Sequence, residues 1–123
     1  IKWQAIEFKD RTGIQCKFVD HLDDFEPDLE RSTTVFRIFQ ETLTNIVRHS
    51  GATQVYVTLS HSSEIITLQV RDNGCGISSQ QVASLRSLGL LGMRERAMVW
   101  GGNVQICGVP NSGTTVTINI KKG

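Results

Sequence analysis

The amino-acid sequence predicts an α+β fold, a two-layer α/β sandwich in which helices cover one face of a mixed sheet of about five strands. Two observations lead to this prediction. Several short segments alternate apolar and polar side chains, as half-buried strands do. Residues 29–49 instead repeat apolar side chains at helical spacing. The chain has 123 residues, which suffices for one domain with its own core.

Each expected element has a local signal. Strands show alternation, helices show a period near 3.6, and Gly, Pro, Asn or Ser clusters separate them. In order along the chain, the first half is expected to hold the end of a helix over residues 1–10 stopped by Thr12 and Gly13, a strand over 14–19, a loop over 21–28 and a long helix over 29–49. Strands over 55–59 and 65–71 then form a hairpin. The rest is expected to hold a short helix over 78–85, a glycine-marked loop over 86–92, a helix over 93–100, and a second hairpin with strands over 104–107 and 114–120.

Composition excludes several classes of protein. The 13 basic and 12 acidic residues nearly balance, so nothing directs the domain as a whole to nucleic acid or to an anionic membrane. The three cysteines are far apart and form no C-x-x-C pair, which favours free thiols in the cytoplasm over a zinc site or a disulfide framework. No apolar run approaches the roughly 18 residues of a membrane span. Because the first residue is Ile1, we expect a fragment of a longer protein.

The most informative stretch is Asp72-Asn73-Gly74-Cys75-Gly76, which directly follows the alternating run over residues 65–71. A strand that ends in D-x-G-x-G holds one carboxylate at a fixed exit point. The two glycines have no Cβ, so the backbone can approach a flat ligand closely. Such a carboxylate suits an exocyclic amine, for example the 6-amino group of adenine. The same pattern also fits a plain turn between two hydrophobic segments.

The long predicted helix carries a polar stripe opposite its apolar face. Phe36, Phe39, Leu43, Ile46 and Val47 fall within an arc of roughly 100° and predict the core side. Glu41, Asn45 and Arg48 lie together on the other side of the helix. The stripe fits a solvated surface. It also fits phosphate handling, because an amide oxygen can bind a hard cation, an arginine pairs with phosphate oxygens, and a glutamate can act as a base.

A second glycine set, Gly89-Leu90-Leu91-Gly92-Met93, precedes the predicted helix over residues 93–100. The exposed amides of a helix N-terminus attract anions, although a flexible connection explains the glycines equally well. Arg94 and Arg96 near the start of this helix oppose its dipole unless an anion lies close by. Further on, Thr114 opens the last strand and can bring a hydroxyl beside Asp72.

Taken in order, four segments resemble the motifs of the ATP-binding catalytic domain of sensor histidine kinases, within the gyrase, chaperone, histidine kinase and mismatch-repair ATPase superfamily. Residues 39–50 resemble the N box, 70–77 the G1 box, 89–96 the G2 box and 113–116 the closing strand motif. The Q-E-x-L-x-N-x-x-R-H and G-L-x-G-M-R-E-R patterns are similar to those of the subfamily whose partners are NarL/LuxR-type response regulators. The resemblance covers nearly the whole chain and implies the Bergerat ATP-binding fold.

The resemblance also implies roles for the matching residues. Asp72 would accept the adenine amino group, with Thr114 at the same edge, and Gly74 and Gly76 would let the nucleotide pass. Asn45 would ligate Mg²⁺, and Glu41 matches the acid that activates water in hydrolysing relatives. Contacts with the phosphates would come from Arg48, at a position where the family often has lysine, and from a short lid at Gly89, Leu90, Leu91, Gly92 and Met93. His49, which belongs to the N box, would be a further nucleotide-binding residue. Ser87 and Leu88 replace a glycine and a histidine that are usual there, which bears on lid flexibility.

For domain organisation, the resemblance implies that residues 1–12 are the remnant of an upstream dimerisation and phosphoacceptor helix, and that 13–123 form the catalytic domain. The intact protein, cytoplasmic or membrane-tethered through upstream segments, would be a homodimer. It would bind Mg-ATP, transfer the γ-phosphoryl group to a histidine outside this chain, and relay it to a response regulator. An anti-sigma-type protein-serine kinase and a degenerate binding module are the alternatives. His21, His49 and His61 do not replace the missing acceptor.

Overall fold

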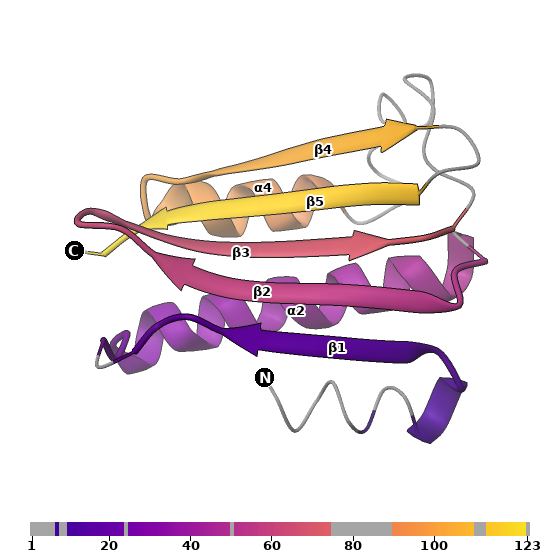
Figure 1. The fold of residues 1–123 in the computed structure, drawn as a ribbon. Helices are drawn as coiled ribbons and strands as arrows, with labels where there is room; N and C mark the ends of the chain where they lie inside the picture. Colours follow the sequence, from indigo (N-terminus) through magenta and orange to yellow (C-terminus); the bar gives the residue numbers. More distant parts are fainter. Residues whose placement is uncertain are drawn as a thin grey trace.

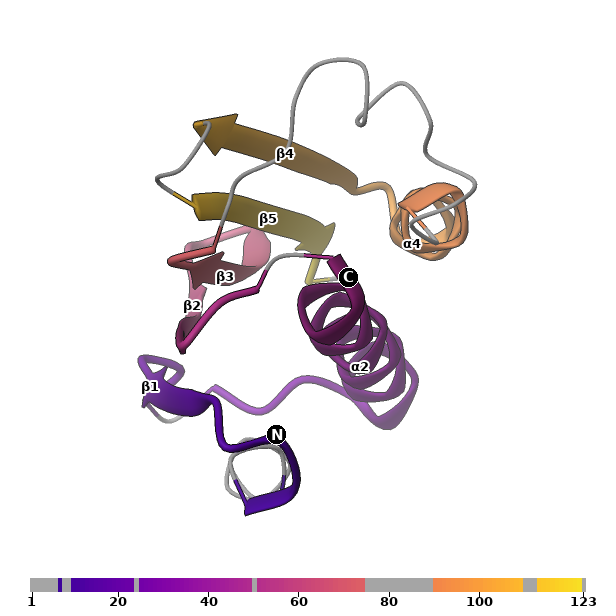
Figure 2. The same cartoon turned by 90° about the vertical axis from the view of Figure 1, so that its right-hand side faces the viewer.

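The structure is a computed structural model that describes residues 7, 10–23, 25–49, 51–74, 90–109 and 113–122, and the side chains of all these except 45–49, 90, 91 and 109. The elements are β1 (Gln15–Asp20), α2 (Leu29–His49), β2 (Gln54–His61), β3 (Ile65–Asp72), α4 (Leu90–Val99), β4 (Asn103–Val109) and β5 (Gly113–Lys121). The five strands form one sheet in the order β1-β2-β3-β5-β4, and α2 and α4 lie on one face of it (Figures 1 and 2). The predicted two-layer α+β fold with a mixed sheet is therefore confirmed.

The sheet is mixed because of how its strands are connected. β1 and β2 are parallel, and α2 forms the crossover between them over one face of the sheet. β2 and β3 are joined by residues 62–64 as an antiparallel hairpin. β5 then pairs antiparallel with both β3 and β4. Both predicted hairpins are therefore confirmed.

Alternation along the strands separates a buried face from a polar face. The helix-facing positions of β2, β3 and β5 hold Val55, Val57, Leu59, Ile66, Leu68, Val70, Val116, Ile118 and Ile120, all buried. The helices contribute Ile38, Phe39, Met93 and Ala97 to the same core. The opposite face carries polar side chains that bond across strands, such as Thr67 to Asn119 at 2.7 Å. Burial of the apolar row is the main stabilising term of the fold.

α2 begins where the sequence predicts and buries a slightly rotated face. The carboxylate of Asp28 accepts the N–H of Arg31 at 2.8 Å, which makes Asp28 the N-cap. Val35, Ile38 and Phe39 are buried, whereas Phe36 is only half-buried, so its prediction as a core residue was wrong. Gly51, with φ of 64°, follows the end of the helix.

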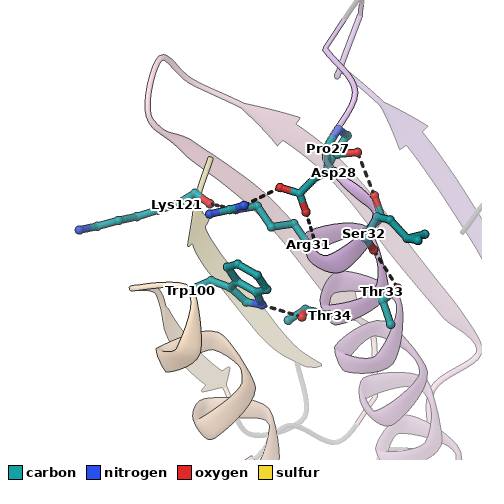
Figure 3. A network of polar contacts seen from close by, with 9 residues as sticks. Pro27, Asp28, Arg31, Ser32, Thr33, Thr34, Trp100 and Lys121 are labelled. Atoms are coloured by element: carbon teal, nitrogen blue, oxygen red, sulfur yellow. Dashed lines mark hydrogen bonds and ion pairs between the residues drawn. The ribbon is translucent and has the colours of Figure 1, made fainter. Parts of the chain in front are cut away.

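α4 begins three residues earlier than predicted, because residues 90–92 are already helical rather than part of a loop. Its C-terminal end is tied to α2 and β5. The indole N–H of Trp100 donates to Thr34 Oγ1 at 2.8 Å, and the Arg31 guanidinium lies 4.3 Å from the centre of the Trp100 ring (Figure 3). Arg31 Nε also donates to the Lys121 carbonyl oxygen at 2.7 Å. These contacts fix α4 against the sheet at one end.

The helix stop at Thr12 and Gly13 can be compared with the structure, whereas the short helix over residues 78–85 cannot. Residues 10–12 are helical and Gly13 follows with φ of 75°, so the predicted helix stop at Thr12 and Gly13 is confirmed. The short helix expected over residues 78–85 lies outside the described residues. Among the described residues, no helix has both the length and the apolar character that crossing a membrane requires.

Candidate functional site

Asp72 and Thr114 end two apolar rows that face the helices. Asp72 continues the buried row of Ile66, Leu68 and Val70 at the end of β3, and Thr114 precedes Val116 in the corresponding row of β5. Arg71 pairs with Thr115 in the ladder between these strands, which brings the two rows to the same end of the sheet. Only 6% of Asp72 and 7% of Thr114 is exposed. The structure thus joins two residues that lie 42 positions apart in the sequence.

The Asp72 carboxylate is held by backbone donors. Its Oδ1 accepts the Gly74 N–H at 2.8 Å. Burial raises the pKa of the Asp72 carboxyl, and backbone hydrogen bonds from Gly74 and Thr114 oppose that shift. A carboxylate has about four acceptor positions, so lone pairs remain for a further donor. The site therefore presents a buried acceptor at the end of a strand, which fits an amino group of a flat ligand.

Gly113 allows the two strand ends to meet. Its φ is 99°, a conformation that side chains disfavour, and a Cβ placed on it would overlap the carbonyl oxygen of Asp72 and lie 3.2 Å from Asn73 Cα. Any side chain here would push the start of β5 away from the end of β3. Gly113 is the first residue of the 113–116 motif, but no role was predicted for it. Its position in the turn just before Thr114 was the available signal.

Asn73 was also missed as a functional candidate. Its Oδ1 accepts the N–H groups of Thr53 and Gln54, each at 2.9 Å, and its Nδ2 donates to Thr53 Oγ1 at 2.9 Å. Its own N–H donates to the Gln54 carbonyl oxygen at 3.2 Å. Asn side chains often accept hydrogen bonds from nearby backbone groups in turns, so the sequence indicated that Asn73 could bond to backbone. It could not indicate the partners, because they are 19 and 20 positions away.

Glu41 lies in a different place from Asp72. It lines a cavity of about 630 Å³ along α2, to which the N-terminal segment contributes Glu7 and Arg11 and α4 contributes Arg96; the other lining residues, all on α2, are Thr33, Phe36, Arg37, Gln40, Leu43 and Thr44. Glu41 and Arg96 bring opposite charges to it from α2 and α4. Neither Asp72 nor Thr114 is among the lining residues that the structure describes.

The remaining predicted site residues are placed only in part. Asn45, Arg48 and His49 lie in the last turns of α2, and their side chains are outside the described set. Gly76 and Gly89 are also outside it. Leu90, Leu91 and Gly92 form the first turn of α4. Met93 is fully buried, with its sulfur 3.3 Å from Thr42 Oγ1, so its side chain belongs to the core.

Asp72 and the N-terminal turn of α4 each offer a feature that can meet a ligand. Within the described part of the chain, no group of three or more His, Cys, Asp or Glu side chains could hold a metal. α4 has no acidic residue in its first turn, and the N-terminus of a helix carries a partial positive charge. A ligand with an amine for Asp72 and an anionic group for this end of the molecule would match both features.

Comparison with known proteins identifies relatives. Residues 30–123 match the family described as histidine kinase-, DNA gyrase B-, and HSP90-like ATPases. The sensor protein VraS of Staphylococcus epidermidis is 35% identical over 105 residues, which are 85% of this chain and 30% of the relative. VraS of Staphylococcus aureus is 34% identical over the same length. The chain thus spans 30% of the length of these sensor proteins.

Solved structures share the fold. The catalytic domain of the histidine kinase ThkA superposes with a TM-score of 0.80 at 18% identity, over 98% of this chain and 86% of that one. The histidine kinase domain of a blue-light activated kinase from Erythrobacter litoralis gives a TM-score of 0.77 at 22% identity, over 98% of this chain and 58% of that one. At these identities the likeness concerns the fold alone.

Proposed function

Because the chain belongs to the family of histidine kinase-, DNA gyrase B- and HSP90-like ATPases, we propose that it is the ATP-binding catalytic domain of a two-component sensor histidine kinase. In the intact protein it would transfer the γ-phosphoryl group of Mg-ATP to a histidine of the dimerisation domain. A NarL/LuxR-type response regulator would then receive the group. The names of the relatives and the shared fold of kinase catalytic domains support this proposal.

The observation that carries the proposal is the buried carboxylate of Asp72. Its position at the end of β3, with backbone bonds from Gly74 and Thr114, leaves an acceptor for the 6-amino group of adenine. A purine without that amino group would leave the buried acceptor unsatisfied, which costs affinity. Thr114 would complete the polar edge that meets the base, and Gly74 and Gly76 would leave room for it.

The phosphates would lie toward the ends of α2 and α4. The backbone of residues 89–93 includes the N-terminal turn of α4, where free N–H groups and the helix dipole attract anions. Arg48 and His49 would add contacts from the last turns of α2. A magnesium ion carried by the nucleotide prefers oxygen ligands, and Asn45 would supply an amide oxygen to it.

Transfer would depend mainly on placing the phosphoryl group and neutralising its charge. Glu41 lines the cavity along α2, to which α4 contributes Arg96, and an incoming acceptor side chain would enter there. We assign Glu41 the role of an acid or base beside that acceptor. Without the acceptor domain, the chain would bind nucleotide and turn over little.

Calorimetric titration with ADP and Mg²⁺ tests the proposal. We expect saturable binding to the wild type and a loss of at least about tenfold in Asp72→Asn, since the amide cannot serve the adenine amine in the same way. Asp20→Asn is the matched control, because Asp20 is exposed and ends β1 at the opposite end of the sheet. No binding to the wild type, or equal affinity in Asp72→Asn, would contradict the proposal and favour a module that acts through protein contact.

A further inference from the structure

Asn73 makes an unusual set of bonds for an exposed side chain. Its side-chain amide makes three hydrogen bonds: Oδ1 accepts the N–H groups of Thr53 and Gln54, and Nδ2 donates to Thr53 Oγ1. Its backbone N–H donates a fourth bond, to the Gln54 carbonyl oxygen. The side chain is exposed, so it contributes little to the apolar core. Its hydrogen bonds therefore fix the position of the backbone at residues 53, 54 and 73, and add little to the burial of apolar surface.

The partners of Asn73 lie at a junction of several elements. Gln54 is the first residue of β2 and Thr53 directly precedes it, four residues after His49, the last residue of α2. The Thr53 carbonyl oxygen also accepts the N–H of Gln15, the first residue of β1, at 3.0 Å. Asn73 thus ties the end of β3 to the starts of β1 and β2 and to the connection that leaves α2.

Asp72 lies between this junction and the core. It pairs with Val55 in the last step of the ladder between β2 and β3, and Asn73 makes the bonds directly beyond that step. Terminal ladder pairs fray when nothing beyond them is held. Removing the Asn73 amide would therefore let the peptide between residues 72 and 73 shift, and the Asp72 carboxylate would shift with it.

We propose that Asn73 is a positioning residue that sets the Asp72 carboxylate relative to the end of α2, and thereby determines how strongly the site prefers adenine to purines without a 6-amino group. This inference rests on the proposed function, in which Asp72 reads that amine. Asn73 itself would not contact the nucleotide. Its effect should consequently appear in the preference between bases and not in affinity for the shared phosphates.

The experiment compares the dissociation constants of ADP and of purine riboside diphosphate, which lacks the 6-amino group, in the presence of Mg²⁺. In the wild type we expect ADP to bind more tightly by about tenfold or more. In Asn73→Ala this ratio should fall toward that of Asp72→Asn, whereas the affinity for purine riboside diphosphate should change by less than about threefold. A general loss of structure would lower both affinities together.

Two further variants make the result specific. Asn73→Asp should keep the wild-type ratio, because a carboxylate can accept both N–H groups and the Thr53 hydroxyl can rotate to donate to it. Asn73→Gln retains the amide but moves it by one methylene, so the preference for ADP over purine riboside diphosphate should fall. Because residue 73 is exposed, the longer side chain can be accommodated, and this variant provides the test if Asn73→Ala does not fold. Asn119→Ala is the control, since Asn119 bonds across the open face of the sheet to Thr67 and Asn103.

The outcomes separate the two proposals. If the wild type and Asp72→Asn show the same ratio, Asp72 does not read the base and the proposed function fails. If Asp72→Asn loses the preference but Asn73→Ala and Asn73→Gln keep it, only the role of Asn73 is overturned. Equal losses for both nucleotides in the Asn73 variants would likewise show a structural role alone. Amide hydrogen exchange at Thr53 and Gln54 supplies a readout without nucleotide, and should accelerate in Asn73→Ala but not in Asn73→Asp.

Discussion

The guanidinium of Arg31 lies 4.3 Å from the centre of the Trp100 ring and connects the N-terminal turn of α2 to the C-terminal end of α4. The same guanidinium pairs with Asp28 and bonds to the Lys121 carbonyl oxygen at the end of β5 (Figure 3). One side chain thus joins both helices to the sheet. The N-terminal end of α4 belongs to the candidate phosphate region. The Arg31–Trp100 contact holds the other, C-terminal end of the same helix.

Arg31→Ala should lower the free energy of unfolding by about 2–3 kcal/mol, because it removes a cation–π contact and a hydrogen bond from a charged donor. Arg31→Lys should lose less, since it keeps the charge but not the planar group. Urea denaturation measures the difference. Arg37→Ala, on the exposed side of the same helix, is the control and should stay within about 0.5 kcal/mol of the wild type. Equal effects of Arg31→Ala and Arg37→Ala would contradict the importance of the contact.

Asp28→Ala should destabilise α2 by removing its N-cap, and Asp28→Asn should do so less because it retains an acceptor for the Arg31 N–H. Backbone and side-chain hydrogen bonds from Arg31 lower the pKa of Asp28 in the folded state. Its ionised form therefore stabilises the protein above the ordinary carboxyl pKa, and this contribution disappears as the pH falls through the lowered value. Thermal melts across the acid range should show a smaller decline for Asp28→Asn than for the wild type.

Met93→Ala should be among the most damaging single changes, because Met93 is fully buried between α4 and α2. Truncation of such a side chain costs about 2–5 kcal/mol, depending on how far the site collapses. Met98→Ala on the same helix is the control, since 69% of Met98 is exposed. The two melting temperatures give the comparison, and a similar drop in both would argue against the described docking of α4.

Gly113→Ala should reduce stability by more than about 1 kcal/mol and weaken ADP binding, because it adds both backbone strain and a clash with the Asp72 carbonyl oxygen. Gly13→Ala separates the two causes. Gly13 also has a positive φ, 75°, but nothing lies within 4 Å of the position of its Cβ. Only Gly113→Ala should therefore affect ADP affinity, and a similar loss in Gly13→Ala would point to general destabilisation.

Asp72→Asn should become more stable relative to the wild type as the pH rises. Burial raises the pKa of Asp72 in the folded state, so the folded protein binds its proton more tightly than the unfolded chain does. The stability from this group is present below the unfolded pKa of about 3.9 and is lost as the pH rises through the folded value. Urea denaturation of both proteins between acid and neutral pH measures the trend. A constant difference across that range would show that burial of the charge has no energetic cost.

Local patterns were sufficient for most elements. The alternation over residues 65–71 placed β3 and left Asp72 at its end, and the apolar repeat over 29–49 matched α2. Gly92 predicts a loop, so the predicted start of α4 is wrong by three residues; packing of Met93 and Ala97 on the core keeps this turn helical. Phe36 was misplaced because the helix rotation depends on its neighbours, and periodicity alone has a tolerance of about one residue.

By itself, the sequence determined the type and order of the elements and the motif residues, because these depend on contacts and conformations local to a few positions. Only the tertiary structure decided that β5 lies between β3 and β4, and so that Thr114 and Gly113 meet Asp72. It also decided that Asn73 bonds to Thr53 and Gln54 and that Arg31 covers Trp100. These contacts join residues 19 to 69 positions apart, where no local pattern records the pairing and only the packing of the whole chain selects it.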